Sequence, residues 1–204
     1  MSGILFVISA PSGTGKTTVA RRVQTVIPGL EWSVSYTTRS PRPGEEDGRE
    51  YHFVTDEAFR GLETEGLFLE NAEVFGNRYG TGQAQTQDKL AEGRDLLLEI
   101  DVQGAAQVRR GPVEAVSVMI LPPDFATLEA RLESRGSEAP EQRAGRLAKA
   151  RTEAEEYPHF DYIVVNSELD RAVEDVASIV RAERRRISRC ADEAQSILDG
   201  FPGR

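Results

Sequence analysis

The sequence predicts an α/β fold in which helices cover both faces of a parallel β-sheet. Short apolar runs that fit buried strands alternate along the 204 residues with segments of helical periodicity. The run at residues 4–9 is nearly continuous, as is typical of a central parallel strand covered on both faces. Further strands of the core are predicted at residues 31–36, 96–101, 115–121 and 162–166.

The first apolar run opens a phosphate-binding motif. It leads into a glycine-containing loop and a helix predicted for residues 15–27; the loop reads Ala10-Pro11-Ser12-Gly13-Thr14-Gly15-Lys16-Thr17-Thr18. This order of strand, loop, Lys-Thr and helix is the P-loop arrangement, whose backbone N–H groups and helix N-terminus bind a phosphate. Lys16 would reach the β- and γ-phosphates of a nucleoside triphosphate, and the Thr17 hydroxyl would ligate Mg²⁺. A glycine-rich turn that binds nothing is the alternative.

Residues 35–82 are interpreted as a strand-rich lobe inserted into the α/β core. They begin with a polar loop that holds two prolines and two glycines. Short strands are predicted at 51–54, 68–75 and 77–81, and Thr55 is predicted to cap a short helix. The P-loop core would then comprise residues 1–34, 83–124 and 158–204.

Two helical regions follow the lobe. Residues 125–157 are rich in Arg, Glu and Ala, and we expect them to form a helical lid on the surface. A long helix is predicted from about Glu168, with an apolar stripe that runs as far as Ala194. Its basic run at 181–189 is interpreted as a solvated face, and Cys190 as a small buried apolar group.

Composition argues against several kinds of partner. The chain has 25 Lys and Arg against 34 Asp and Glu, and a net charge of −9 disfavours general attraction to nucleic acid or to an anionic membrane. Local arginines must therefore hold any anionic substrate. The single cysteine rules out an intramolecular disulfide, and no stretch could span a bilayer. We expect a cytoplasmic protein with no nucleic-acid or membrane partner.

Acidic residues end the strand predicted at 96–101. Glu99 and Asp101 lie two residues apart, so both side chains can face the crevice at the carboxyl end of the sheet. Two solvated carboxylates are the alternative. In P-loop enzymes an acid at the end of a neighbouring strand helps to hold Mg²⁺, which makes Glu99 the candidate metal ligand beside Thr17.

The arginines of interest fall into two groups. Arg39 and Arg42 lie in the polar loop of the lobe, and together with Tyr51 and Tyr79 they suit a phosphomonoester. The second group lies in the lid region and can stabilise a phosphoryl group during transfer; its members are Arg131, Arg135 and Arg146. Any one of them alone could be a surface arginine on a polar helix.

Together these residues resemble the guanylate kinase family, whose members phosphorylate GMP. The resemblance runs from about residue 4 to residue 180. Besides the P-loop it rests on residues 33–42, 48–51, 70–76, 79–81 and 98–104. The Thr-Thr-Arg-x-Pro-Arg pattern within the first of these is more specific than the P-loop, which many NTPases share. Two residues depart from the family pattern: Ala10 replaces the usual glycine, and Glu99 stands where some relatives have Asp.

The resemblance implies two nucleotide sites. The ATP site would comprise residues 10–18, with Asn166 near the adenine. In the lobe, the GMP phosphate would be held by Arg39, Arg42, Tyr51 and Tyr79, and the guanine by Ser35, Glu70, Thr81 and Asp101. A carboxylate such as Glu70 can accept from both N1–H and N2–H of guanine, whereas adenine would face it with a lone pair. The catalytic groups would be Lys16 and the lid arginines Arg131, Arg135 and Arg146.

The implied reaction is transfer of a phosphoryl group from ATP to GMP, or to dGMP, with Mg²⁺ as cofactor. Two alternatives stay open. One is a non-catalytic protein-interaction module on the same fold, and the other is a kinase for a sugar phosphate, which would not need residues that recognise guanine. The sequence assigns no oligomeric state.

Overall fold

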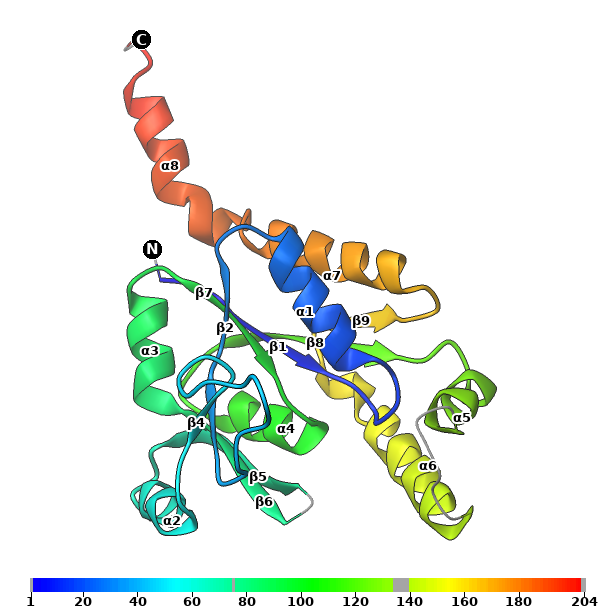
Figure 1. The fold of residues 1–204 in the computed structure, drawn as a ribbon. Helices are drawn as coiled ribbons and strands as arrows, with labels where there is room; N and C mark the ends of the chain where they lie inside the picture. Colours follow the sequence, from blue (N-terminus) through cyan, green and yellow to red (C-terminus); the bar gives the residue numbers. More distant parts are fainter. Residues whose placement is uncertain (1, 75, 134–139, 203–204) are drawn as a thin grey trace.

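A five-stranded parallel sheet forms the centre of the molecule (Figure 1). The computed structural model describes residues 2–74, 76–133 and 140–202. The strand order is β2-β7-β1-β8-β9, and every neighbouring pair runs parallel. The strands are β1 (Leu5–Ser9), β2 (Leu30–Trp32), β7 (Asp95–Glu99), β8 (Ala115–Leu121) and β9 (Tyr162–Val165). The predicted α/β fold is confirmed.

Helices cover both faces of this sheet because its central strand is apolar on both sides. Phe6 and Ile8 of β1 belong to a core shared with α1 (Lys16–Val26) and α7 (Leu169–Glu183). Leu5 and Val7 alternate with them and belong to a second core, which includes residues of α3 (Gln83–Ala91) and α4 (Val102–Arg110). The continuous apolar run near the N-terminus thus serves two cores at once.

A second, smaller sheet carries the insertion. Its order is β4-β3-β6-β5, with β3 parallel to β4 and the other two pairs antiparallel. Phe59 stacks on Phe68 beneath it, with ring centroids 4.5 Å apart. Its elements are β3 (Ser35–Thr37), β4 (Tyr51–Phe53), α2 (Asp56–Thr64), β5 (Phe68–Val74) and β6 (Asn77–Gly82). All of them fall within residues 35–82, and the limits of the lobe as a domain stay a prediction.

The polar region after β8 forms α5 (Phe125–Glu133), α6 (Pro140–Glu155) and the 3₁₀ turn η1 (Tyr157–His159). Leu128, Leu132 and Ala150 are buried together where α5 meets α6. The last helix, α8 (Ile187–Asp199), projects away from the body (Figure 1). Within the described part of the chain, no helix has the length and apolarity needed to cross a membrane.

Two predicted strands have different limits in the structure. The segment at 31–36 is split, because β2 pairs with β7 in the first sheet whereas β3 belongs to the second sheet. The strand at 96–101 ends at Glu99. Asp101 instead caps α4, and its Oδ1 accepts a hydrogen bond from the N–H of Gly104 at 2.8 Å.

The long closing helix predicted from about residue 168 is broken after Glu183. The backbone turns there and a separate helix begins at Ile187, so the predicted apolar stripe does not pack on one core. Cys190 lies on this second helix and is half-buried, which makes its interpretation as a buried group wrong. No residue of α8 is buried.

Candidate active site

A cavity of about 1140 Å³ opens between the P-loop, the second sheet and α6. Of the predicted site residues, those that line it are Ala10, Pro11, Ser12, Gly13, Gly15, Lys16, Thr17, Thr18, Ser35, Tyr51, Glu70, Tyr79, Glu99, Asp101 and Arg146. Thr14, Arg39, Arg42, Thr81, Arg131 and Asn166 do not form its wall, and Arg135 lies outside the described residues. The structure thus joins the loop and most of the lobe residues in one cavity.

The P-loop needs glycine at two positions. Gly13 and Gly15 have φ angles of 90° and 94°, which side chains rarely adopt. A Cβ on Gly13 would lie 2.7 Å from Leu132 Cδ2, and one on Gly15 would lie 2.9 Å from Asn166 Nδ2. Ala10, by contrast, is a buried residue of the hydrophobic core, so its methyl group is accommodated.

Two side chains hold the loop from outside the cavity. The buried Asn166 donates from Nδ2 to the carbonyl oxygen of Thr14 at 2.7 Å. Arg131 on α5 donates to the same carbonyl at 3.4 Å and to the Asn166 carbonyl at 3.0 Å. In this structure both residues therefore fix the shape of the P-loop; contact of Asn166 with adenine stays a prediction.

Lys16 and Thr17 meet the acid at the end of β7. Lys16 Nζ donates to the Ile100 carbonyl at 2.6 Å and lies 4.0 Å from Glu99 Oε1. The Thr17 hydroxyl donates to the same Glu99 oxygen. Burial lowers the pKa of Lys16, and the fields of Glu99, Asp101 and Glu153 oppose that effect.

A buried carboxylate and two hydroxyls form one network in the lobe. Glu70 is 4% exposed, and its Oε1 accepts from the Thr81 hydroxyl at 2.6 Å. The Thr81 hydroxyl lies 3.0 Å from that of Ser35. Glu70 also packs against the first turn of α4, where a Cβ on Gly104 would lie 2.9 Å from Glu70 Oε2. The second sheet and α4 thus hold this carboxylate rigidly.

The environment of Glu70 disfavours its charge. Burial raises the pKa of Glu70 to about 7, with a further increase from Asp101, while the hydrogen bond from Thr81 and the charge of Lys16 act the other way. A ligand that donates two N–H groups to the Glu70 carboxylate would stabilise its ionised form. The arrangement therefore favours a ligand with paired donors on one edge.

The polar loop holds Arg39 close to the two tyrosines. Its guanidinium lies 5.4 Å from the Tyr51 ring centroid, and the Tyr51 and Tyr79 rings meet edge to face at 5.8 Å. Arg39 also binds both carboxylate oxygens of Glu45 at 2.9 Å. Arg42 is exposed and donates its backbone N–H to Glu45 at 2.8 Å. Glu45 thus accepts from both the Arg39 guanidinium and the Arg42 backbone N–H.

Glu153 on α6 is a site residue that the sequence analysis missed. Its side chain is buried, lines the cavity, and accepts the backbone N–H of Ser12 in the P-loop at 3.0 Å. Lys149, one turn earlier, lies 3.6 Å from it. A glutamate four residues after a lysine is common on solvated helices. Only the packing of α6 against the phosphate loop therefore reveals that Glu153 binds the loop.

The donor set at Thr17 and Glu99 fits a Mg²⁺ ion that arrives with a nucleotide. Hydroxyl and carboxylate oxygens are the ligands this ion prefers, and it usually keeps waters and phosphate oxygens as the others. No group of three His, Cys, Asp or Glu side chains suited to a metal occurs among the described residues. Such an ion would be bound by these two side chains together with oxygens of the nucleotide.

Fold and cavity define a P-loop nucleotide kinase, and comparison with known proteins narrows the class. The guanylate kinase family model matches residues 2–183. A guanylate kinase of Syntrophotalea carbinolica is 49% identical over 198 residues, covering 97% of this chain and 94% of the relative. One of Neisseria meningitidis serogroup B is 52% identical over 187 residues, with coverage of 92% and 91%.

A solved structure agrees with these relatives. The crystal structure of guanylate kinase from Anaplasma phagocytophilum matches with a TM-score of 0.70 at 33% identity, and the match covers 92% of this chain and 89% of that chain. The chain belongs to the guanylate kinase family.

Removing the carboxylate of Glu153 should disturb the ATP side of the site selectively. We expect Glu153→Ala to lower kcat/KM for ATP about tenfold, because a hydrogen bond to a charged group is lost from the phosphate loop. Glu153→Gln, whose amide oxygen still accepts, should recover part of the loss, and KM for GMP should change little. Steady-state kinetics with Glu155→Ala as the exposed control on the same helix test this. Equal kinetics for the Glu153→Ala and Glu155→Ala variants would contradict the role.

Burial of Glu70 should cost the free protein stability at high pH. The pKa of Glu70 is about 7 in the folded chain against an ordinary value of 4.5, so the folded state binds more protons between these values. Stability contributed by the protonated group is lost as pH rises through this window. Urea unfolding should show Glu70→Gln more stable than wild type at pH 8 by about 1–3 kcal/mol, with a smaller difference at pH 5. A difference independent of pH would refute this.

Proposed function

We propose that this protein transfers the γ-phosphoryl group of ATP to GMP and gives ADP and GDP. The observation that carries the proposal is the buried Glu70 carboxylate, which lines the same cavity as the P-loop and accepts a hydrogen bond from Thr81. The Thr81 hydroxyl lies beside that of Ser35, which also lines the cavity. The carboxylate accepts from N1–H and N2–H of guanine, and a hydroxyl donates to O6. Adenine would direct an acceptor lone pair at the carboxylate, and this repulsion strongly disfavours the binding of adenine.

The P-loop side binds ATP in this proposal. Backbone N–H groups of the loop and the N-terminus of α1 surround the phosphates, and Lys16 supplies a fixed positive charge at the transferring group. Thr17 and Glu99 would hold Mg²⁺, which offsets phosphate charge when bound with the nucleotide. Asn166 and Arg131 keep the loop in shape through the Thr14 carbonyl.

The lobe binds the phosphate of GMP. Arg39 and Arg42 supply charged donors and the hydroxyls of Tyr51 and Tyr79 supply neutral ones. For Arg39 to bind a phosphate with both arms, its bonds to Glu45 must be released. The phosphate of GMP therefore competes with the Glu45 carboxylate for Arg39. Replacement of Glu45 by the phosphate would link GMP binding to movement of the polar loop.

The lid completes the reaction site. Arg146 on α6 lines the cavity, and we assign it, with Arg131 and Arg135, to stabilising the transferring phosphoryl group. Closure of lobe and lid would exclude water, which otherwise competes with GMP as acceptor. The proposed compartment is the cytoplasm, as the sequence analysis expects, and the proposed role is in purine nucleotide metabolism.

Loss of Lys16 should abolish turnover without loss of the fold. We expect Lys16→Ala to reduce kcat by about a thousandfold or more, because the charge at the transferring group disappears. Its unfolding midpoint should not fall, since this lysine is desolvated in the free protein. A coupled assay of ADP formation, with Lys89→Ala on α3 as control, makes the comparison. Full activity of the Lys16→Ala variant would contradict the proposed mechanism.

Protonation of Glu70 should weaken GMP binding. In wild type we expect kcat/KM for GMP to fall as pH drops below about 7, because the protonated carboxyl no longer accepts from both guanine donors. Glu70→Gln should lower kcat/KM for GMP about tenfold to a hundredfold and leave KM for ATP unchanged. Titration of the GMP phosphate affects the wild type and the Glu70→Gln variant alike. The difference between their pH profiles of kcat/KM therefore reports the titration of Glu70 alone.

The choice of acceptor in the assay separates the alternatives. GMP, dGMP, AMP and a ribose phosphate should be compared at equal ATP. If Glu70 recognises guanine, the first two react and the others do not. Preference for the ribose phosphate would instead indicate a sugar-phosphate kinase on the same fold.

A further inference from the structure

One helix of the core, α4, contacts the strand that carries Glu70. That strand, β5, lies at the edge of the second sheet and pairs with β6 on its inner side. Leu69 of β5 is buried in the second core together with Ala105 and Val108 of α4. The next residue, Glu70, lines the cavity. The contact between α4 and β5 therefore joins the lobe to the core directly beside Glu70.

The side-chain amide of Gln107 pairs with β5 on its outer side. Asn71 donates its backbone N–H to Gln107 Oε1 at 3.0 Å, and Gln107 Nε2 donates to the Asn71 carbonyl oxygen at 2.8 Å. An edge strand presents such backbone groups without a partner from its own sheet. An amide suits this pair of groups, since it offers one acceptor and one donor side by side. Gln107 thus takes the place of a neighbouring strand and ties β5 to α4.

Positions along one side of α4 meet consecutive residues of β5. Asp101, Gly104 and Gln107 recur at a spacing of three, which places them on the same side of the helix. A Cβ on Gly104 would lie 2.9 Å from Glu70 Oε2, while Gln107 holds the backbone of Asn71. A shift of β5 along α4 would therefore break both bonds of Gln107 and move the Glu70 carboxylate.

We propose that Gln107 is a positioning residue for guanine recognition, which sets the place of the Glu70 carboxylate through the backbone of Asn71. This role rests on the proposed function of Glu70 as acceptor of guanine N1–H and N2–H. Neither Gln107 nor Asn71 is among the described residues that line the cavity, so Gln107 acts without touching the base. A binding group must be held to within about 0.5 Å, and that precision comes from supporting contacts of this kind.

A merely structural role of Gln107 would have a different effect. If its amide only closed the edge of β5, its loss would lower the stability of the protein and weaken all acceptors alike. Loss of a positioning residue changes the ratio between two acceptors that differ in the group bound by Glu70. Inosine monophosphate (IMP) is the matched probe, because its base keeps N1–H and O6 but lacks the N2 amino group of guanine.

Isothermal titration calorimetry of Gln107→Met with GMP and with IMP measures this ratio. Methionine keeps the length of the side chain and removes both hydrogen bonds to Asn71. We expect the preference for GMP, as the ratio of the Kd for IMP to the Kd for GMP, to fall about tenfold, because the bond from N2–H to Glu70 is lost. The KM for ATP should stay unchanged.

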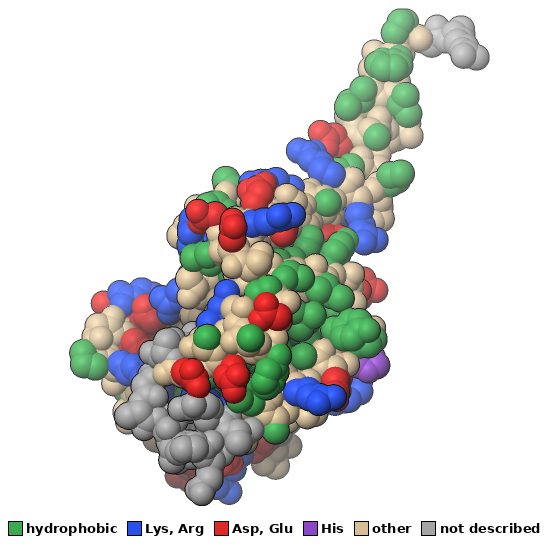
Figure 2. Space-filling view, turned by 90° about the vertical axis from the view of Figure 1, so that its right-hand side faces the viewer, with side chains coloured by type: hydrophobic (Ala, Val, Ile, Leu, Met, Phe, Trp, Pro, Cys, Tyr) green, Lys and Arg blue, Asp and Glu red, His purple; other side chains and the backbone are tan. Residues whose placement is uncertain are grey.

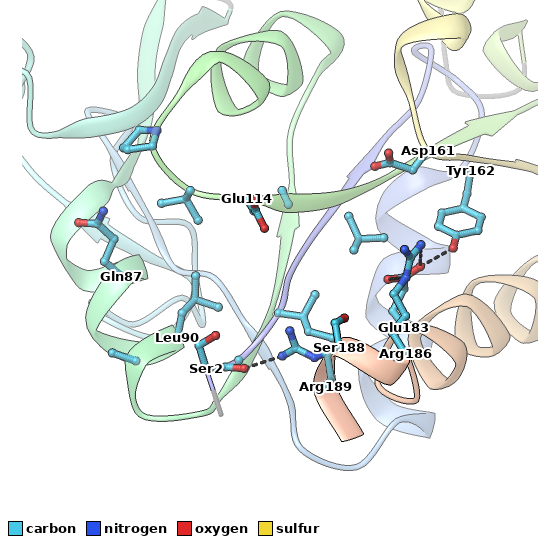
Figure 3. A pocket seen from close by; sticks show the side chains of 17 residues that line it. Ser2, Gln87, Leu90, Glu114, Asp161, Tyr162, Glu183, Arg186, Ser188 and Arg189 are labelled. Atoms are coloured by element: carbon cyan, nitrogen blue, oxygen red, sulfur yellow. Dashed lines mark hydrogen bonds and ion pairs between the residues drawn. The ribbon is translucent and has the colours of Figure 1, made fainter. Parts of the chain in front are cut away.

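Two glutamines on other helices serve as matched controls. Gln87 on α3 lines a separate cavity of about 590 Å³, whose wall includes Ile4 and Ala115 beside the amino ends of β1 and β8 (Figure 3). Gln195 lies on α8, which projects from the body (Figures 1 and 2). The P-loop follows the carboxyl end of β1, so both positions lie away from the proposed guanine site. Gln87→Met and Gln195→Met should keep the wild-type preference.

A double-mutant cycle tests whether Gln107 acts through Glu70. In a Glu70→Gln background, Gln107→Met should have little further effect on the preference for GMP, because the carboxylate that Gln107 positions is absent. An equal effect of Gln107→Met in both backgrounds would overturn the role.

Circular dichroism and the KM for ATP verify that the variants fold. If Gln107→Met does not fold, Gln107→Glu takes its place: a carboxylate can accept from the Asn71 N–H but cannot donate to the carbonyl, so the preference should again fall. A wild type that does not phosphorylate GMP would overturn the proposed function and this role with it. A wild type that phosphorylates GMP, together with a folded Gln107 variant that keeps the wild-type preference, would overturn the role of Gln107 alone.

Discussion

Carboxylates of the protein hold the phosphate-binding donors of this site in place. The backbone N–H of Ser12 binds Glu153, the Thr17 hydroxyl binds Glu99, and Arg39 binds Glu45 with both oxygens. Each carboxylate thereby orients its donor and keeps that donor from binding to other acceptors. In the proposed reaction the phosphate of GMP competes with Glu45 for Arg39, and it can displace that carboxylate because it carries more charge and more oxygens. Glu99 and Glu153 would stay in place, the first as a ligand of Mg²⁺ and the second as a support of the phosphate loop.

The three acceptors belong to different parts of the fold. Glu153 belongs to α6 and Glu45 to the polar loop of the lobe, whereas Glu99 ends a strand of the central sheet. If GMP takes the place of Glu45 on Arg39, as proposed, the polar loop of the lobe loses a bond to the site and can rearrange. Glu99 is fixed at the end of a strand of the sheet, and Glu153 joins α6 to the phosphate loop at Ser12. The parts that would move on binding therefore depend on which element carries each carboxylate.

Local patterns predicted the elements well, and contacts between distant residues explain what they missed. The apolar run and the Gly-Lys-Thr sequence define strand, loop and helix within 15 residues, so the P-loop could be predicted. The bond between Ser12 and Glu153 spans 141 residues, and it exists only because α6 packs beside the loop. Close to the helix break, Glu183 accepts from the Tyr162 hydroxyl, a contact with a distant strand that the periodicity of the helix does not reveal. From the sequence, Cys190 is expected to be a small buried apolar group, but the residue is half-buried because it lies on α8, which leaves the body after Glu183.

In the proposed GMP site, specificity would be obtained at the expense of the free energy of folding. The network of Glu70, Thr81 and Ser35 buries a carboxyl whose pKa is raised to about 7, and the hydrogen bond from Thr81 only partly offsets the desolvation. A neutral amide there would be easier to bury, yet it would present one acceptor and one donor in place of two acceptors. Two parallel N–H donors on a purine edge need the two acceptor oxygens of an ionised carboxylate. In the proposed site, the free-energy cost of burying that charge therefore accompanies the property that would select guanine.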